Sequence, residues 1–366
     1  MRKILVFAVS FLVGISMISG CGGKDEGKET TQAESKGSSN SQNNSASDSA
    51  NEEEKKSLQV FAMDTYMNLT AYGEQAEEGL QEAKKRIEEL DEKLSIGNKS
   101  SEIYQINKNG KGKVSEDTSY LIERSLDIWK DTEGAFNPVM EPVMETWGFT
   151  SGNYKVPTKQ ELKKCLALTD ATGVQLDSNK ENVTLTQKDM KLDLGGIAKG
   201  YTSSEIMKIF KQLNMKSAMV SLGGNAQVLG SKTDGSPWKI AIQDPEEEEQ
   251  YLGILQVKNK AVITSGGYER YFEKDGKTYH HIIDPSTGYP AESGLLSVSI
   301  VSEDGTLADG LSTALFVMGK EKAEKYWKKN SKYFDAVFFT TDHKLYVTEG
   351  IAKDFSSEKE FEVIKK

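Results

Sequence analysis

Apolar residues recur every three or four positions in several segments of the chain, a spacing that places them on one face of a helix. The clearest case is the segment 75–94, in which apolar residues from Leu80 to Leu94 form one stripe. Thr158 opens another such segment and has a glutamate three positions later, which is typical of a capping box. The pattern predicts helices over 75–94, 117–130, 158–166, 197–213, from 306 onward and over 321–330.

Short runs rich in β-branched and aromatic residues lie between these segments and are typical of strands. Because helices and strands are mixed without regular β-α-β alternation, the pattern favours an α+β fold of mixed sheets with packed helices. We expect this fold to occupy residues 58–366, enough for one large domain or two tightly packed lobes. The expected strands are 59–62, 67–72, 183–185, 191–194, 218–222, 238–242, 252–257, 261–264, 295–301, 336–340 and 344–347.

The first residues have a different pattern. Two basic residues precede an apolar run, 4–18, which is too short to span a bilayer comfortably. The run leads into the letters ISGC, which end at Cys21 and are similar to a bacterial lipobox. We therefore expect residues 1–20 to be a lipoprotein signal peptide, with acylation of Cys21 and attachment to the extracytoplasmic face of the cell membrane. An ordinary signal peptide or a membrane anchor is the alternative.

Residues 22–57 contain no aromatic and no branched apolar residue. Such a segment cannot bury a core, so we expect residues 21–57 to be the lipidated cysteine followed by a disordered tether. The chain has 2 cysteines, and with Cys21 acylated, Cys165 has no partner for an intramolecular disulfide. The formal net charge of −10 makes a nucleic-acid partner a poor fit. An anionic ligand would need local lysines, helix ends or a metal.

The stretch from Tyr279 to Thr313 carries the strongest candidate chemistry. It begins with YHHIIDPSTGYP, and near its end Asp309 and Thr313 are four positions apart, so on a helix they share a face. Oxygen donors near a histidine suggest a hard cation such as Mg²⁺ beside a general base, a combination suited to phosphate chemistry. The simpler alternative is that the run from Thr306 to Asp309 is a capping box at the start of the helix.

A second candidate segment is KLDLGGIAKG at 191–200. In it we expect a strand ending at Asp193, a close turn at two glycines, and a helix with Lys199 in its first turn. Free amides at a helix N-terminus bind anions, and a lysine there adds charge. The spacing of a Walker loop is absent, and glycine pairs between a strand and a helix are common, so by itself this segment favours a structural role.

Together with these two stretches, the chain carries five recognisable segments in all. They are MDT at 63–65, GAFNP through WGF at 134–149, DLGGIAKG at 193–200, HIIDPSTGYP at 281–290 and ADGLST at 308–313. In this order they closely resemble the ApbE-type FAD:protein FMN transferases. The resemblance covers most of the expected domain, and the lipobox fits it as well. It implies the ApbE-type flavin transferase fold.

The resemblance also implies an activity and a site. Such enzymes cleave FAD with Mg²⁺ and attach FMN through a phosphoester to a threonine or serine of an exported acceptor protein, releasing AMP. By motif position, the histidine before the IIDP stretch, His281, is the expected base. The expected metal ligands are the Gly196 carbonyl, the Asp309 carboxylate and the Thr313 hydroxyl. The expected FAD contacts are Met63, Ala135, Phe136, Asn137, Asp193, Lys199 and Ile282.

The chain departs from the family pattern at three positions. Ile96 stands in a stretch where many members have an aromatic residue that stacks on the flavin. Asn137 stands where many have aspartate, which removes a charge but keeps an acceptor. Ser312 stands where some have a second acid, so the metal would be held by fewer charges.

Several alternatives remain open at this stage. The same residues would serve an FAD pyrophosphatase with water as acceptor. A lipid-anchored flavin-binding protein would have a similar leader and charge, but it would not need to activate a hydroxyl. His281 could also be a structural residue that fixes the turn at Asp284 and Pro285, and His280 is a second, less favoured candidate for the base.

Overall fold

An antiparallel hairpin opens the part of the chain that the structure describes. The computed structural model describes residues 54–366, so the predicted signal peptide, Cys21 and most of the tether lie outside the described residues. Strand β1 (Lys55–Ala62) pairs with β2 (Thr65–Tyr72). The turn between them holds Met63 and Asp64 at φ values of 50° and 57°. Because β1 begins at Lys55, regular structure starts before the expected boundary at residue 58.

The hairpin continues into a nine-stranded sheet with the order β1-β2-β6-β7-β10-β13-β14-β15-β17. All neighbouring strands are antiparallel except β15 and β17. The remaining strands of the sheet are β6 (Ser217–Leu222), β7 (Asn225–Gly230), β10 (Ala261–Gly266), β13 (Leu295–Ser302), β14 (Asp335–Thr340), β15 (Leu345–Thr348) and β17 (Phe361–Ile364).

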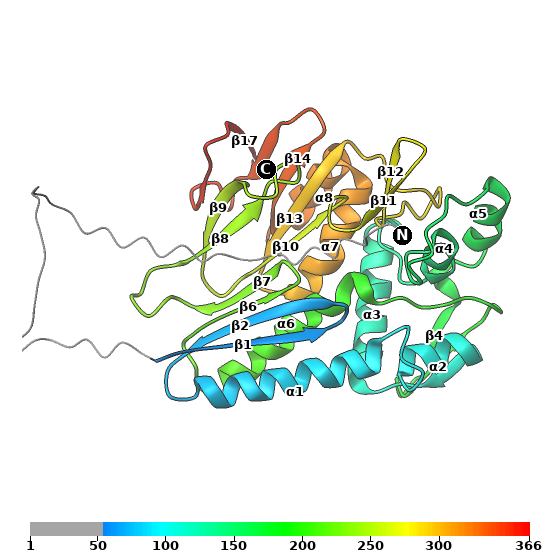
Figure 1. Ribbon diagram of the computed structural model, residues 1–366, viewed down its shortest axis with the longest axis horizontal. Helices are drawn as coiled ribbons and strands as arrows, with labels where there is room; N and C mark the ends of the chain where they lie inside the picture. Colours follow the sequence, from blue (N-terminus) through cyan, green and yellow to red (C-terminus); the bar gives the residue numbers. More distant parts are fainter. Residues whose placement is uncertain (1–53) are drawn as a thin grey trace, which may run out of the picture. The chain divides into compact units, whose positions relative to one another are not determined.

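Helix α6 (Gly195–Gln212) lies against β6 and β7 on one face of this sheet (Figure 1). The second half of α6 packs with β1, β2 and α1 (Ala76–Leu94), where Phe210 and Leu80 share a core. The first half packs in a second core with β10, β13, α3 (Glu116–Asp131), α7 (Gly305–Met318) and α8 (Lys320–Asn330). Helix α6 therefore joins the cores of the two halves of the sheet.

The opposite face of the C-terminal half of the sheet is covered by a small three-stranded sheet. Neighbouring residues of β10 point to opposite faces, as the pleat requires: Ile263 enters the helix-covered core and Val262 the core beneath the small sheet. The small sheet consists of β16 (Phe355–Ser356), β9 (Tyr251–Val257) and β8 (Trp238–Gln243).

The remaining helices are short. They are α2 (Glu102–Asn109), α4 (Glu141–Trp147) and α5 (Lys159–Leu166), together with the 3₁₀ turn η1 (Ala171–Gly173). A three-stranded sheet contains β3 (Lys111–Lys113), β5 (Asn182–Leu185) and β4 (Val174–Leu176), and a hairpin contains β11 (Tyr271–Lys274) and β12 (Lys277–His280). Among the helices of residues 54–366, none is both long and apolar enough to cross a bilayer.

The α+β fold predicted from the sequence is confirmed. The capping box at Thr158 and Glu161 is present as predicted. The strand predicted at 191–194 is wrong, because another part of the chain takes up its backbone hydrogen bonds. The Asn107 side chain accepts from Leu192 N at 2.7 Å and donates to Leu192 O at 2.8 Å, and Asp193 N donates to the Pro138 carbonyl at 2.8 Å.

Candidate functional site

Helices α6 and α7 cross very closely at two glycines. A Cβ built on Gly200 would lie 2.1 Å from the Gly305 carbonyl oxygen and 2.5 Å from the Asp309 Cβ. Since real Cβ atoms do not approach other atoms so closely, only glycine at position 200 permits this crossing. The crossing brings α7 against the first turns of α6. These turns begin with the glycine pair of the KLDLGGIAKG segment, Gly195 and Gly196.

Asp309 is buried at this crossing, with 5% of its surface exposed. Its carboxylate accepts hydrogen bonds from Gly200 N at 2.7 Å and from Asn225 Nδ2 at 3.1 Å. Burial raises the pKa of Asp309, against the opposing charge of Lys199. Its carboxylate is therefore held between two helices, where burial disfavours its charged form.

The capping-box alternative for this segment is wrong. Helix α7 begins at Gly305, and its N-cap is Asp304, whose side chain accepts from Leu307 N at 3.0 Å. Asp309 therefore lies in the second turn and points at α6. An aspartate one position before the glycine is as good a cap as the threonine after it, so the sequence alone does not separate the two registers.

The other two predicted metal ligands lie beside each other. A Cβ built on Gly196 would be 3.8 Å from Thr313 Oγ1 and 3.1 Å from the Phe136 ring. In a regular α-helix the Gly196 carbonyl accepts from the N–H of Gly200, and here that N–H lies 2.7 Å from Asp309. The carbonyl has two lone pairs, so it retains capacity for another partner. Gly196, Asp309 and Thr313 therefore lie close together near the start of α6.

A chain of hydroxyls stands behind Thr313. Ser265 Oγ on β10 lies 2.8 Å from Ser312 Oγ and 3.5 Å from Thr313 Oγ1, and Ser312 Oγ donates to the Asp309 carbonyl oxygen at 2.8 Å. Ser312 is fully buried, so it acts here as a hydrogen-bonding residue of the helix. In residues 54–366 no group of three His, Cys, Asp or Glu side chains could hold a metal ion. The donors at this place are one carboxylate, one hydroxyl and one carbonyl.

Two of the predicted FAD contacts lie against the first half of α6. Met63, in the β1–β2 turn, has its sulfur 3.7 Å from Thr202 Oγ1 on α6. The Phe136 ring contacts Gly196, as described above. Ala135, next to Phe136, is half-buried in the loop that follows α3.

Asn137 has a structural explanation. Its amide nitrogen donates to the Thr169 carbonyl at 2.9 Å, and its amide oxygen accepts from Val139 N at 3.0 Å. An ionised aspartate can accept but cannot donate, so it could not make the first of these bonds. The departure from the family pattern therefore fits the way this chain holds its loop.

Asp193 and Lys199 lie at the start of α6. Asp193 accepts from Gly195 N at 2.8 Å. The pKa of Asp193 is raised by burial and lowered in part by Arg270. The Lys199 charge acts on three nearby groups, Asp309, Glu269 and His281. Lys199 therefore adds positive charge at the N-terminal end of α6, where the helix dipole also favours anions such as phosphates.

His281 has the geometry of a general base. Its Nδ1 lies 3.1 Å from the Arg270 carbonyl oxygen. A carbonyl only accepts, so in the neutral ring the proton is on Nδ1 and Nε2 keeps a free lone pair. Surrounding protein lowers the pKa of His281, and the positive charge of Arg270 adds to this. The ring is only half-buried, so water and substrate still reach it.

The neighbouring histidine is different. The His280 ring packs edge-on against Phe316, with 5.6 Å between ring centroids, and its buried Nδ1 has no hydrogen-bond partner in the described residues. Ile282 is 4% exposed and its side chain lies in the core, while its carbonyl accepts from Ala291 N at 3.0 Å. Ile96 packs partly against the same core.

The sequence did not single out Glu269. Burial and the charge of Asp309 raise the pKa of Glu269 to about 7, while Lys199 opposes this. Glu269 is exposed to solvent, and its interactions with Asp309 and Lys199 place it at the border of the site. Its only signal in the sequence is its place shortly after the glycine pair Gly266 and Gly267 at the end of β10.

Comparison with known proteins agrees with this geometry. The family model described as the ApbE family matches residues 63–338. The "FAD:protein FMN transferase" of Haemophilus influenzae is 33% identical over 274 residues, covering 72% of this chain and 78% of the relative. The protein of the same name from Klebsiella pneumoniae is 35% identical over 266 residues, covering 71% of this chain and 81% of the relative.

Solved structures show the same likeness. The crystal structure of an ApbE protein from Thermotoga maritima matches with a TM-score of 0.77 and 32% identity, covering 84% of this chain and 100% of that one. The flavin transferase ApbE from Vibrio cholerae matches with a TM-score of 0.75 and 27% identity, covering 82% and 99%. The family model spans well over half of the chain, and the matched segment contains every predicted site residue of the folded part; the chain belongs to the ApbE family.

Proposed function

We propose that this chain is an FAD:protein FMN transferase. It cleaves the pyrophosphate of FAD, joins FMN through a phosphoester to a threonine or serine of an exported acceptor protein, and releases AMP. The observation that carries the proposal is the meeting of Gly196, Asp309 and Thr313 at the start of α6, within the field of Lys199 and near a histidine with a free Nε2.

The residues at this place fit Mg²⁺. The donor set is all oxygen, as Mg²⁺ prefers, and leaves coordination positions for phosphate oxygens and water. A buried carboxylate with a raised pKa also gains from a nearby cation. We assign the Gly196 carbonyl, the Asp309 carboxylate and the Thr313 hydroxyl as the ligands. When bound, Mg²⁺ neutralises the pyrophosphate and stabilises the leaving AMP.

The side chains of this protein then have separate tasks. Lys199 and the positive N-terminal end of α6 bind the phosphates, while Met63 and the loop 135–137 hold the rest of FAD. His281 Nε2 accepts the proton of the acceptor hydroxyl as its oxygen attacks the FMN phosphorus. The bond from that phosphorus to the bridging oxygen breaks, and AMP leaves with this oxygen. General-base help of this kind is typically worth about 10²–10⁴-fold in rate.

The competing functions differ in what they release. An FAD pyrophosphatase would release AMP and free FMN without an acceptor, and a flavin-binding protein would release neither. The test is AMP release from FAD with Mg²⁺, with and without a threonine-bearing FMN-binding-domain protein exported by the same cell. Protein-bound flavin fluorescence equal to the AMP released supports transfer. AMP accompanied only by free FMN makes the chain a hydrolase.

We also propose that the protein is anchored by a lipid on Cys21 at the extracytoplasmic face of the membrane. The support is the ISGC junction and the polar character of residues 22–57. This arrangement places the domain where an exported acceptor is available. A lipid anchor with a polar tether also lets the domain reach acceptors attached to the same membrane.

A further inference from the structure

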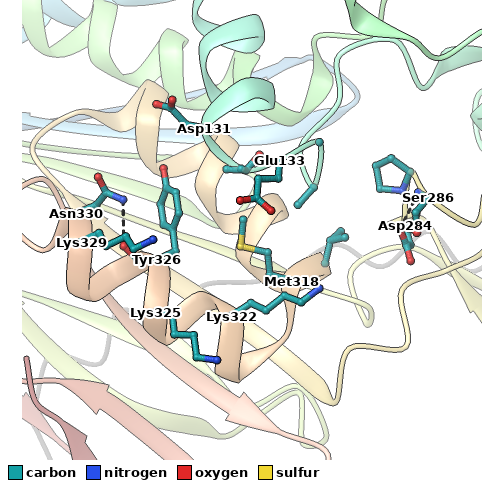
Figure 2. A pocket seen from close by; sticks show the side chains of 15 residues that line it. Asp131, Glu133, Asp284, Ser286, Met318, Lys322, Lys325, Tyr326, Lys329 and Asn330 are labelled. Atoms are coloured by element: carbon teal, nitrogen blue, oxygen red, sulfur yellow. Dashed lines mark hydrogen bonds between the residues drawn. The ribbon is translucent and has the colours of Figure 1, made fainter.

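A groove of about 690 Å³ lies next to the site. Its walls are the C-terminal end of α3, the junction of α7 and α8, and the turn that follows Ile282 (Figure 2). The volume lies in the range of sites that bind small ligands or short peptide segments. The side chains of α8 form one wall, and those of the α3 end face them across the groove. No step of the proposed reaction uses this groove.

The α8 wall is basic. Lys322, Lys325 and Lys329 line the groove and are exposed, and their spacing of three and four places them on one face of the helix. In the described part of the chain, none of these three forms an ion pair, whereas Lys320 and Lys328 of the same helix pair with Glu324 at 3.0 and 3.2 Å. The groove is therefore lined by three lysines without an ion-pair partner in the described residues, although the formal net charge of the protein is −10.

The facing wall is acidic. Asp131 and Glu133 line the groove at the end of α3, and both are exposed. Asp284, in the turn, already accepts from Ser286 N at 2.8 Å. Among residues 54–366 no ion pair crosses the groove, so the two rows of charge face each other without meeting. An occupant that satisfies both rows must carry negative charge on the α8 side and neutral or positive groups on the other.

The groove begins where the proposed metal ligands end. Val317, which lines it, is one turn beyond Thr313 on α7, about 6 Å along the helix axis. Ala135, on the other wall, is next to Phe136, whose ring contacts Gly196. A chain lying in the groove could therefore continue directly to the reacting phosphorus.

We propose that this groove docks an extended acidic segment of the acceptor polypeptide and presents its hydroxyl to the site. The inference rests on the proposed function, since it names the acceptor's binding surface. Successive side chains of an extended segment point to opposite sides, so one row of carboxylates faces Lys322, Lys325 and Lys329 while the alternate residues face Asp131 and Glu133. A flat anionic membrane cannot enter a groove with an acidic wall. FAD itself is a poorer fit, because Ala135 is the only one of its expected contacts that lines the groove.

The first test is binding of two labelled synthetic peptides to the full chain, measured by fluorescence anisotropy. One has a threonine and aspartates at alternate positions, and the other has asparagines in place of the aspartates. The aspartate peptide should bind more tightly, and added salt should weaken it. Exposed ion pairs are worth about 0.2–1 kcal/mol, so Lys325→Glu should weaken it by about 1.5- to 5-fold and reversal of all three lysines by about 3- to 100-fold.

Lys328→Glu is the matched control, because it makes the same charge change on the same helix at a residue that does not line the groove. It should leave binding within about twofold. Equal binding of the two peptides, or equal weakening by Lys328→Glu and Lys325→Glu, overturns the proposal. Vesicles that contain anionic lipid provide a further control. If Lys325→Glu loses binding to these vesicles while its peptide binding is unchanged, the lysines belong to a membrane-binding surface and the docking proposal is overturned.

The second test separates docking from chemistry. In FMN transfer to an acceptor protein, the triple reversal should raise the acceptor KM by about 10-fold and leave kcat unchanged, with FAD affinity unaltered. A loss of FAD affinity would make the groove part of the FAD site and overturn the docking role. If the unmodified enzyme releases AMP but labels no protein, the proposed function is wrong. If the unmodified enzyme and the triple variant transfer FMN equally well, the proposed function stands and only the docking role of the groove is wrong.

Discussion

The backbone N–H of Gly200 on α6 donates a hydrogen bond to the carboxylate of Asp309 on α7, with 2.7 Å between nitrogen and oxygen. The bond is possible because glycine lets the two helices cross at this point. It holds the only carboxylate among the three proposed ligands in a fixed place beside the Gly196 carbonyl. The predictions below begin with these two residues.

Asp309→Asn should reduce FMN transfer by orders of magnitude while the protein stays folded. The amide oxygen can still accept from Gly200, and Asn225 can rotate its own amide to accept from the new NH₂ group. What is lost is the negative charge for Mg²⁺. The measurement is AMP release over a titration of Mg²⁺, together with the melting temperature without metal. Full activity at limiting Mg²⁺ would contradict the metal assignment.

Gly200→Ala should destabilise the protein and also lower activity. The added methyl group would overlap the Gly305 carbonyl and the Asp309 Cβ, and overpacking of this kind typically costs about 1–3 kcal/mol. The free energy of unfolding from urea titration measures the effect. Gly97→Ala is the control, because a Cβ built there would meet only Ser95 Oγ, at 3.9 Å, among the atoms beyond its two chain neighbours in the described residues. Equal stability of the two variants would show that α6 and α7 can move apart freely.

His281→Asn should bind FAD almost normally and transfer FMN slowly. With the usual histidine pKa of about 6.5, the rate would fall as the pH drops through that value. The lowered pKa of His281 moves this fall to lower pH, because the ring stays neutral and able to accept a proton. The measurement is the pH–rate profile of the unmodified enzyme beside that of the variant. A structural role would instead weaken FAD binding and lower the melting temperature.

The same lowered pKa gives a prediction for stability. Below about pH 6.5 the unfolded chain binds a proton on this histidine that the folded chain does not. The contribution of His281 to stability is therefore complete above that pH and is lost progressively as the pH falls toward the folded pKa. Urea titrations across this range should show a smaller acid destabilisation in His281→Asn. If the stability of both proteins depends on pH in the same way, the His281 ring is solvated in the folded protein and the prediction is wrong.

Cys21→Ala should leave unprocessed precursor or shift the protein out of the lipid-anchored fraction. The reason is that the lipobox presents this sulfur for acylation before cleavage. Cell fractionation and mass spectrometry of the intact protein give the answer, with Cys165→Ala as a matched control. Diacylglycerol on the Cys21→Ala protein would exclude the lipobox interpretation.

The sequence predicted those features that depend on local patterns. Helix α1 and the Thr158 cap follow from spacing and side-chain chemistry over a few residues. The motifs placed Asp309 and Thr313 on one helix correctly.

The features that sequence reasoning missed depend on distant contacts. The false strand at 191–194 arises because the backbone of Leu192 bonds to Asn107, 85 positions away. The choice between two caps for α7 is settled by the crossing at Gly200, and the charge around Glu269 comes from Lys199 and Asp309 on two other elements. Such contacts leave no periodic signal in the chain.

The position of α6 across two cores has a consequence for the way ligands affect the fold. Its first half, with Ile197, packs in the core that contains α7, and its second half, with Phe210, packs in the core that contains the N-terminal hairpin. On the proposed function, FAD and Mg²⁺ bind between α6 and α7 and must leave before these two helices can separate, so they act as a removable clamp on the core that contains both. At ligand concentrations about 100 times Kd such a clamp adds about 2.7 kcal/mol, and amide hydrogen exchange in β10 and α7 should slow accordingly.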